Sequence, residues 1–122
     1  MIGVGVDLVE IDRFRAALAR TPSMADRLFT SAERDYAARQ ADPAPRLAVR
    51  FAAKEAVLKC LGLGLGGMPM GEIEVVRDES TGRPDLRLHG RAAEVAAAHG
   101  VREWRLSLSH TDSMAQATAV AL

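Results

Sequence analysis

Residues 50–59 read Arg50-Phe51-Ala52-Ala53-Lys54-Glu55-Ala56-Val57-Leu58-Lys59, and they contain both lysines of this 122-residue chain. All other basic residues are arginine, so two positions that kept lysine indicate a site with a special requirement. Lysine carries a compact ammonium on a flexible stem, whereas arginine carries a planar fork, and the two are not interchangeable at a tight site. Glu55 lies one helical turn before Lys59 and shares its helix face. A carboxylate and an ammonium on a buried helix are typical of a polyanion site, with or without a metal.

The same segment belongs to a long helix predicted from about residue 46 to 61. Apolar residues at positions 47, 51 and 58 and several alanines form its apolar stripe, and Gly62 is a residue type that ends helices. Further helices are predicted at 12–20, 22–29, 30–40 and 90–99. Strands are predicted at 2–9, 72–77, 85–89, 104–110 and 115–122, the last two as a hairpin. The sequence therefore predicts one α+β domain over residues 1–122, with the long helix packed on an antiparallel sheet that the first strand closes.

The composition restricts the class of protein. A chain of this length with 48% hydrophobic and 26% charged residues folds as one globular domain. The formal net charge is zero, which argues against a nucleic-acid partner. No apolar run is long enough for a membrane span, and the first residues do not resemble a signal peptide. The only cysteine, Cys60, excludes an internal disulfide and fits a reducing cytoplasm.

The glycine-rich segment 62–71 does not predict a nucleotide-binding loop. A dinucleotide fingerprint requires glycines after a strand and before a helix, and these glycines follow a helix and precede a strand. A phosphate-binding P-loop requires a lysine after its last glycine, and none is present. The segment is interpreted as a helix terminator with a flexible connection, or as a loop that moves over a ligand.

Asp7 and Glu55 are the candidate metal ligands. Both carboxylates lie in apolar surroundings, Asp7 on the first strand and Glu55 on the long helix. If that helix packs on that strand, the two converge on one hard cation, and Mg²⁺ commonly takes one or two carboxylates with waters and substrate phosphates. Two plainer alternatives stay open: an i,i+4 ion pair of Glu55 with Lys59, and a buried Asp7 with ordinary hydrogen-bond partners.

The segment Ser107-Leu108-Ser109-His110-Thr111 ends a predicted strand. Ser109 and His110 are neighbours, but adjacent strand residues point to opposite faces, so a serine–histidine hydrolase pair is not favoured. His110 is interpreted either as a structural histidine or as a donor to a phosphate at the strand end.

Taken together, the start Gly3-Val4-Gly5-Val6-Asp7, the segment 50–59 and the strand 107–110 resemble the holo-acyl-carrier-protein synthases, the short 4′-phosphopantetheinyl transferases. The Phe29-Thr30-x-x-Glu33 box and the turn 81–84 also match that family, and the resemblance covers the whole chain. One departure is visible. Many members carry an aromatic residue near the end of the glycine-rich loop, where this chain has Met68-Pro69-Met70, so the shape of the pocket edge is left open.

The resemblance implies a Mg²⁺-dependent transfer of the phosphopantetheine arm from coenzyme A to a serine of apo-acyl carrier protein, releasing 3′,5′-ADP. It also implies the 4′-phosphopantetheinyl transferase fold and a role in fatty acid or polyketide biosynthesis. Asp7 and Glu55 would hold the metal, and Lys59 would contact the pyrophosphate, so these three would be the catalytic residues. The residues expected to bind coenzyme A are Arg50, Lys54, Lys59, Arg83, Pro84, His110 and Thr111.

The family also implies a homotrimer with active sites between subunits. Arg13 and Arg20, seven residues apart on the first helix, would then face the acidic carrier protein. The serine proton would pass to Glu55 or to a metal-bound water, and the sequence does not choose between them. Two rival functions stay open from the residues alone: a magnesium-dependent nucleotide phosphohydrolase, and a noncatalytic oligomeric binding module.

Overall fold

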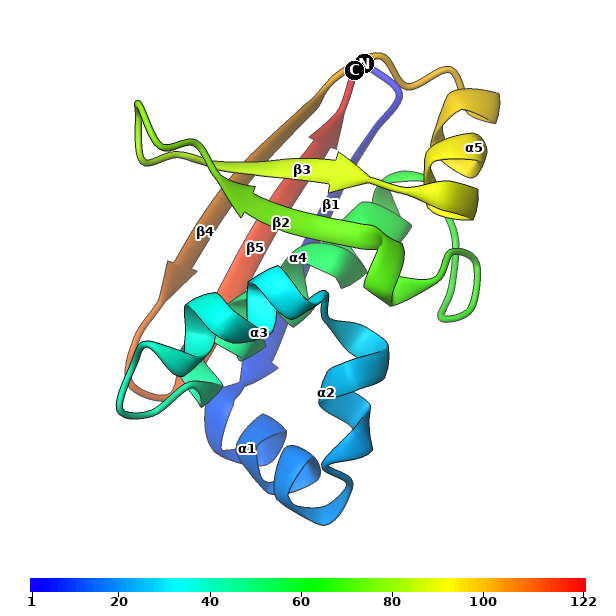
Figure 1. Ribbon diagram of the computed structural model, residues 1–122. Helices are drawn as coiled ribbons and strands as arrows, with labels where there is room; N and C mark the ends of the chain where they lie inside the picture. The colour runs from blue at the N-terminus through cyan, green and yellow to red at the C-terminus, as the bar shows by residue number, and fades with distance from the viewer.

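The computed structural model describes all 122 residues of the chain (Figure 1). Its elements follow one another as β1 Gly3–Glu10, α1 Ile11–Arg20, α2 Ser23–Leu28, α3 Ser31–Ala38, α4 Ala44–Cys60, the 3₁₀ turn η1 Met70–Glu72, β2 Ile73–Arg77, β3 Pro84–Leu88, α5 Gly90–Ala98, β4 Trp104–His110 and β5 Met114–Ala121. The predicted α+β order is confirmed, and the predicted long helix is α4. No helix has the length and apolar character needed to cross a membrane.

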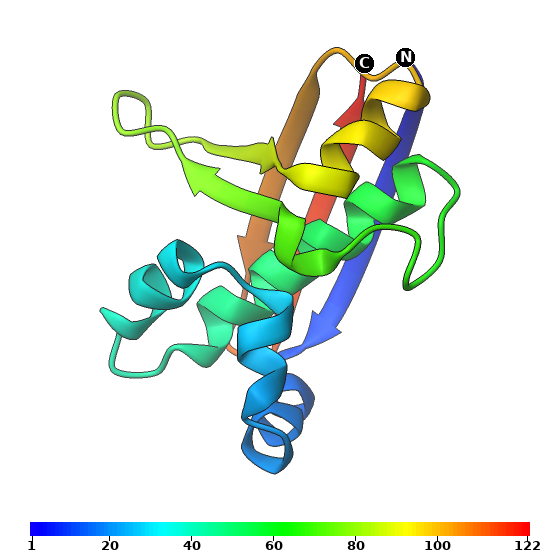
Figure 2. The same cartoon turned by 45° about the vertical axis from the view of Figure 1, so that its right-hand side comes forward.

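The strands form two antiparallel sheets, so the expectation of one sheet is wrong in this detail. β1, β5 and β4 pair in that order, with β5 in the centre, and β2 and β3 form a separate hairpin. Figures 1 and 2 show the hairpin crossing over the same face of the three-stranded sheet that α4 covers. The pattern of alternating residues identifies strands, but it does not say which strands pair.

The close packing of α4 on the sheet requires small residues on both sides. A Cβ atom placed on Gly3 would lie 1.9 Å from the carbonyl oxygen of Cys60, and one on Gly5 would lie 2.0 Å from that of Ala56. The inward-facing positions of β5 are alanines, all fully buried: Ala115, Ala117, Ala119 and Ala121. Glycine and alanine therefore let the helix backbone approach β1 and β5 directly, which fixes the position of Asp7 on β1 relative to α4.

The opposite face of the three-stranded sheet has no covering element (Figures 1 and 2). Valine and leucine side chains of β1 point out of this face, and 57% of Val4, 53% of Val6 and 63% of Leu8 is exposed. Their partners on β5 in the pairing register are Val120, Thr118 and Gln116. The molecule thus presents an exposed, partly apolar sheet face of the kind that protein–protein contacts cover.

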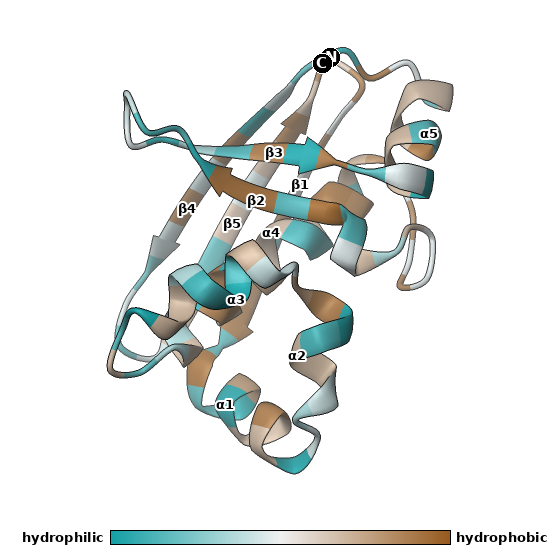
Figure 3. Cartoon of the chain, viewed as in Figure 1, coloured by the Kyte–Doolittle hydropathy of each residue, from teal (hydrophilic) through white to brown (hydrophobic).

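The β2–β3 hairpin is anchored to the helices through buried charges. The colouring of Figure 3 shows β2 as largely apolar with a hydrophilic interruption, which is Glu74, a buried carboxylate. Glu33 accepts from the backbone N–H of Val75 over 2.9 Å, and it completes a capping box with Thr30 at the start of α3. The predicted capping box is confirmed, and it does more than cap, because it also ties α3 to β2.

Candidate active site

Asp7 and Lys59 meet where β1 packs on α4. Lys59 Nζ donates to Asp7 Oδ1 over 3.0 Å and to the backbone carbonyl oxygen of Val6 over 3.0 Å. The Asp7 side chain is 16% exposed, whereas that of Lys59 is 51% exposed. The ammonium of Lys59 is therefore fixed at one end by β1 while remaining accessible to an anion from solvent.

Glu55 lies near this pair on the same face of α4, but the i,i+4 ion pair with Lys59 considered from spacing does not form. Lys59 turns to Asp7 on β1, where the carbonyl of Val6 gives it a second acceptor. Burial raises the pKa of the Glu55 carboxyl, the negative charge of Asp7 raises it further, and Lys59 partly offsets both. The packing of α4 on β1 thus brings the two carboxylates into electrostatic range.

This pair of carboxylates suits a hard divalent cation. Magnesium is often bound by one or two carboxylates together with waters and the phosphates of a substrate. Burial, and secondarily the charge of Asp7, raises the pKa of Glu55, so a cation bound beside it would stabilise the ionised carboxylate. The chain has no group of three or more histidine, cysteine or acidic side chains around one point. The donor set present, Asp7 with Glu55, fits magnesium with two ligands from the protein.

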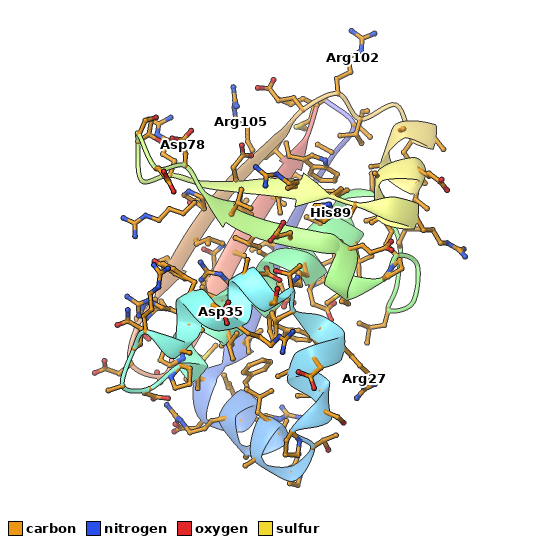
Figure 4. The ribbon with its side chains drawn as sticks, viewed as in Figure 1. Arg27, Asp35, Asp78, His89, Arg102 and Arg105 are labelled. Carbon is orange, nitrogen blue, oxygen red and sulfur yellow. The ribbon has the colours of Figure 1, made fainter.

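A cavity of about 670 Å³ lies among the β2–β3 hairpin, β4 and the first half of α4. Its basic lining comes from all of these elements: Arg46, Arg50, Arg77, Arg83, Arg105 and His110. Two aspartates, Asp78 and Asp85, are the acidic residues in the lining, and Figure 4 shows Asp78 in the hairpin turn and Arg105 on β4. Five guanidinium groups outweigh two carboxylates, so the cavity favours a ligand with several negative charges, such as phosphates.

Arg50 is the buried cation of this cavity, with only 7% of the residue exposed. Its guanidinium lies over the ring of Tyr36, 4.4 Å from the ring centroid, and its Nη1 donates a long 3.4 Å bond to the carbonyl oxygen of Arg46. The buried Nε of Arg50 has no hydrogen-bond partner. Burial lowers the pKa of the guanidinium, which the neighbouring Tyr36 and Glu33 partly offset. The long bond to Arg46 is the only hydrogen bond of the guanidinium within the chain, so Arg50 keeps donors for an anionic ligand in the cavity.

The structure places four of the predicted coenzyme A residues around this cavity: Arg50, Arg83, Pro84 and His110. Thr111 is not among the lining residues. Its hydroxyl instead accepts from the backbone N–H groups of Ser113 and Met114 and closes the β4–β5 turn. Thr111 thus lies in the β4–β5 turn outside the cavity lining, and its contact with the coenzyme stays a prediction.

Lys54 contradicts the expectation that it binds a phosphate. The residue is fully buried, and its Nζ donates to Glu33 Oε1 over 2.8 Å, to the carbonyl oxygen of Met70 over 2.9 Å and to that of Ile73 over 2.5 Å. Three acceptors occupy all three protons of the ammonium. Burial lowers the pKa of Lys54, and the charge of Glu33 opposes that shift. The lysine is the structural cation that joins α4 to α3 and to the start of β2.

Arg13 and Arg20, the expected carrier-protein contacts, are both exposed on α1. Neither forms an ion pair, whereas Arg15 between them is paired with Asp12 and Asp42. Two uncompensated guanidinium groups therefore project from this helix, which is a suitable surface for an acidic partner.

The carboxylate site and the arginine cavity do not meet within one chain. Arg50 precedes Lys59 by nine residues, and at about 3.6 residues per turn this separation places the two on opposite sides of α4. The two groups of residues are also separated on the sheet. Asp7 lies on the edge strand β1, and His110 lies on the other edge strand, β4. The predicted site residues thus form two half-sites at opposite edges of the molecule.

Several residues of the cavity were not identified from the sequence: Tyr36, Arg46, Arg77, Trp104 and Arg105. Two signals were available. Tyr36 is the only tyrosine of the chain and follows the capping box by three residues, and Arg46 and Arg50 have the i,i+4 spacing of one helix face. Arg77 and Arg105 gave no comparable signal, because their convergence depends on how the hairpin lies against β4.

Comparison with known proteins identifies the family of the chain. Residues 3–119 match the 4′-phosphopantetheinyl transferase superfamily. A holo-[acyl-carrier-protein] synthase of Frankia casuarinae is 50% identical over 121 residues, which cover 99% of this chain and 97% of that protein. The structure superposes on the synthase of Neisseria meningitidis with a TM-score of 0.90 at 29% identity, covering 100% of this chain and 99% of that one. It also superposes on the synthase of Bacillus anthracis in complex with CoA (3',5'-ADP), with a TM-score of 0.80 at 30% identity and coverages of 98% and 95%.

The fold and the family match thus define this chain as a transferase. The chain belongs to the 4′-phosphopantetheinyl transferase superfamily and, within it, to the holo-[acyl-carrier-protein] synthases. The family expected from the sequence is confirmed, and so is the expectation of an enzyme.

Proposed function

We propose that the protein transfers the 4′-phosphopantetheine arm of coenzyme A to a serine of apo-acyl carrier protein, with magnesium, and releases 3′,5′-ADP. The observation that carries this proposal is the pairing of two complementary half-sites: a carboxylate and lysine cluster suited to a metal and a pyrophosphate, and an arginine cavity suited to the remaining phosphates. The Bacillus anthracis relative, in complex with CoA (3',5'-ADP), supports the choice of ligand.

In this reaction the serine oxygen forms a bond to the pantetheine-bearing phosphorus, and the bond from that phosphorus to the bridging oxygen breaks, so 3′,5′-ADP leaves. Lys59 neutralises charge on the pyrophosphate as a point cation, which suits phosphoryl transfer because such reactions depend on positioning and electrostatics. Asp7 and Glu55 would hold magnesium, which supplies further charge neutralisation at the leaving oxygen. The serine proton would pass to Glu55 or to a water held beside Asp7 and Glu55 by the metal.

We further propose that the working enzyme is a homotrimer in which each active site combines the Asp7 half-site of one subunit with the arginine cavity of the next. Two observations support this assembly. The half-sites lie at opposite edges of the three-stranded sheet, and the outer face of that sheet exposes Val4, Val6 and Leu8. A head-to-tail contact of opposite edges closes into a ring when the rotation is suitable, and a ring of three completes three sites.

The acceptor is an acyl carrier protein of fatty acid or polyketide biosynthesis, docked on Arg13 and Arg20 of α1. Opposite charges across such a contact steer the encounter of the two proteins, even for an enzyme of zero net charge. The cytoplasmic location stays a prediction from composition, and the buried free thiol of Cys60 agrees with it.

The direct test is the intact mass of an apo-acyl carrier protein after incubation with this protein, coenzyme A and Mg²⁺. We expect a gain of about 340 daltons, the mass of one phosphopantetheine arm, that disappears when EDTA removes the metal. Hydrolysis of coenzyme A without any gain in carrier mass would identify a phosphohydrolase instead. Binding of coenzyme A with neither reaction would identify a binding module.

A further inference from the structure

Tyr36 is the residue around which the arginine cavity is organised, although no part of the proposed reaction uses it. It lies on α3, half-buried, and its side chain lines the cavity. The guanidinium of Arg50 lies over the ring at 4.4 Å from its centroid, and that of Arg39 lies at 5.9 Å. The Tyr36 hydroxyl accepts a hydrogen bond from Arg77 Nη1 over 3.1 Å. One aromatic residue thus contacts cations that come from three different segments of the chain.

The ring of Tyr36 is the main support of the Arg50 guanidinium. No carboxylate pairs with Arg50, its Nε has no partner, and its one hydrogen bond to Arg46 is long. A guanidinium stacked on an aromatic face is held in plane by cation–π attraction, while its edge remains free to donate. Stacking therefore orients Arg50 and leaves its N–H donors free for an anionic ligand. An ion pair with a carboxylate would occupy those donors.

The hydroxyl of Tyr36 plays the corresponding part for Arg77, at the end of β2. Arg77 also lies close to Gly82 in the hairpin turn, where a Cβ atom would approach Arg77 Nη2 to 3.3 Å. A neutral phenol accepts a hydrogen bond from the guanidinium and adds no negative charge to the cavity. The hydrogen bond to Arg77 lowers the pKa of the Tyr36 hydroxyl, against the effect of burial, and Arg46 adds to the lowering. The phenol is thus surrounded by positive charge.

The position of Tyr36 is fixed by the buried contacts of the helix α3 that carries it. The first turn of α3 is locked by the capping box of Thr30 with Glu33, and the Glu33 carboxylate is held by the ammonium of Lys54. Tyr36 lies three residues after Glu33, less than one turn along the same helix. The buried lysine that does not reach the ligand therefore secures the helix that carries Tyr36.

We propose that Tyr36 is a positioning residue for coenzyme A: its ring orients Arg50 and its hydroxyl orients Arg77 toward the phosphates of the coenzyme. This inference rests on the proposed function, because it takes coenzyme A as the ligand of the cavity. Tyr36 acts through the two arginines and takes no part in the transfer itself. Its loss therefore weakens coenzyme A binding and leaves both the turnover at saturating coenzyme A and the KM for the carrier protein unchanged.

The test is steady-state kinetics of the full-length enzyme with Tyr36→Phe and Tyr36→Leu. Tyr36→Phe keeps the ring and removes the hydroxyl, and we expect it to raise the KM for coenzyme A about threefold to tenfold. Tyr36→Leu also removes the stacking, and we expect a further rise. A fall in kcat with an unchanged KM for coenzyme A would overturn the proposal, because that result would indicate a catalytic or merely structural role.

A double-mutant cycle separates positioning from a general loss of stability. Tyr36→Phe should be non-additive with Arg77→Gln, since each removes the same hydrogen bond. It should be additive with Arg83→Gln, a cavity arginine that forms no hydrogen bond or cation–π contact with Tyr36. Equal additivity in both cycles would overturn the proposed link to Arg77. Calorimetry distinguishes a failure of the proposed function from a failure of the role of Tyr36. If the unaltered protein does not bind coenzyme A, the proposed ligand is wrong. If the unaltered protein and both Tyr36 variants bind it equally well, only the role of Tyr36 is refuted.

Discussion

At the scale of single residues, the two lysines that stand out in the sequence have different roles. Lys59 is half exposed and bonded to Asp7 and to the carbonyl of Val6, whereas Lys54 is fully buried among three acceptors. Five residues separate them on α4, so they lie on different faces of the helix. Position 59 therefore requires lysine because the site needs a point charge. Position 54 requires lysine because three buried acceptors need hydrogen bonds from one compact ammonium.

Replacing Lys59 with arginine tests whether the point charge matters. Arginine has more donors than lysine, but its longer planar fork does not reproduce the compact ammonium that bonds to Asp7 and the Val6 carbonyl and faces the pyrophosphate. We expect kcat/KM for the transfer to fall at least about tenfold, with the melting temperature almost unchanged because the side chain is half exposed. Transfer rates followed by carrier mass measure this. A variant within twofold of the original rate would remove Lys59 from the phosphate site.

Replacing Lys54 with methionine tests its structural role. The change leaves the Glu33 carboxylate buried without its cation, and breaking a buried pair in this way typically costs about 3–5 kcal/mol. We expect a loss of this size in the free energy of unfolding, measured by urea denaturation. Adding Glu33→Gln to the same chain removes the uncompensated charge and should recover part of the loss. An unchanged free energy of unfolding in Lys54→Met would contradict the buried-pair interpretation.

At the scale of elements, the packing of α4 on β1 is the contact that brings together the proposed metal ligands. Replacing Gly5 with alanine would place a Cβ atom 2.0 Å from the Ala56 carbonyl oxygen, so the strand must move away from the helix. We expect a loss of about 3 kcal/mol or more in the free energy of unfolding, together with weaker Mg²⁺ dependence as Asp7 and Glu55 separate. Gly64→Ala is the matched control, because a Cβ atom at that glycine meets nothing within 4 Å and should leave the stability nearly unchanged. Similar losses for both variants would contradict this account.

The helices and strands also show which features of the fold can be predicted from the sequence. The bounds of α4 and the order of strands follow from periodicity and from Gly62, and Asp7 and Glu55 follow from carboxylates in apolar segments. The division into two sheets does not follow, because both hairpins have the same alternating pattern. The burial of Lys54 and the role of Tyr36 depend on how α3, α4 and β2 pack together, which no local pattern encodes.

At the scale of the whole molecule, the proposed sharing of the active site between subunits would make a single chain insufficient for catalysis. Asp7 and Glu55 lie at the β1 edge, and Arg50 and His110 line the cavity at the β4 edge. An enzyme whose active site is shared in this way has a testable property that an enzyme with the site in one chain lacks. Two variants, each inactive through the loss of a different half-site, can form an intact site when they assemble together.

We therefore expect activity to return when Asp7→Asn and Arg50→Leu subunits are mixed, unfolded together and refolded. In a trimer of randomly mixed subunits, an intact site requires an Arg50→Leu subunit to supply the carboxylates and an Asp7→Asn neighbour to supply the cavity, so about one quarter of the sites are intact. Carrier mass measures the recovered rate, and light scattering measures the trimer. Leu8→Glu, placed on the exposed sheet face, should abolish both the trimer and the recovery. Mixed trimers without any recovered activity would show that each chain holds a complete site, and would overturn the shared arrangement while leaving the transferase family intact.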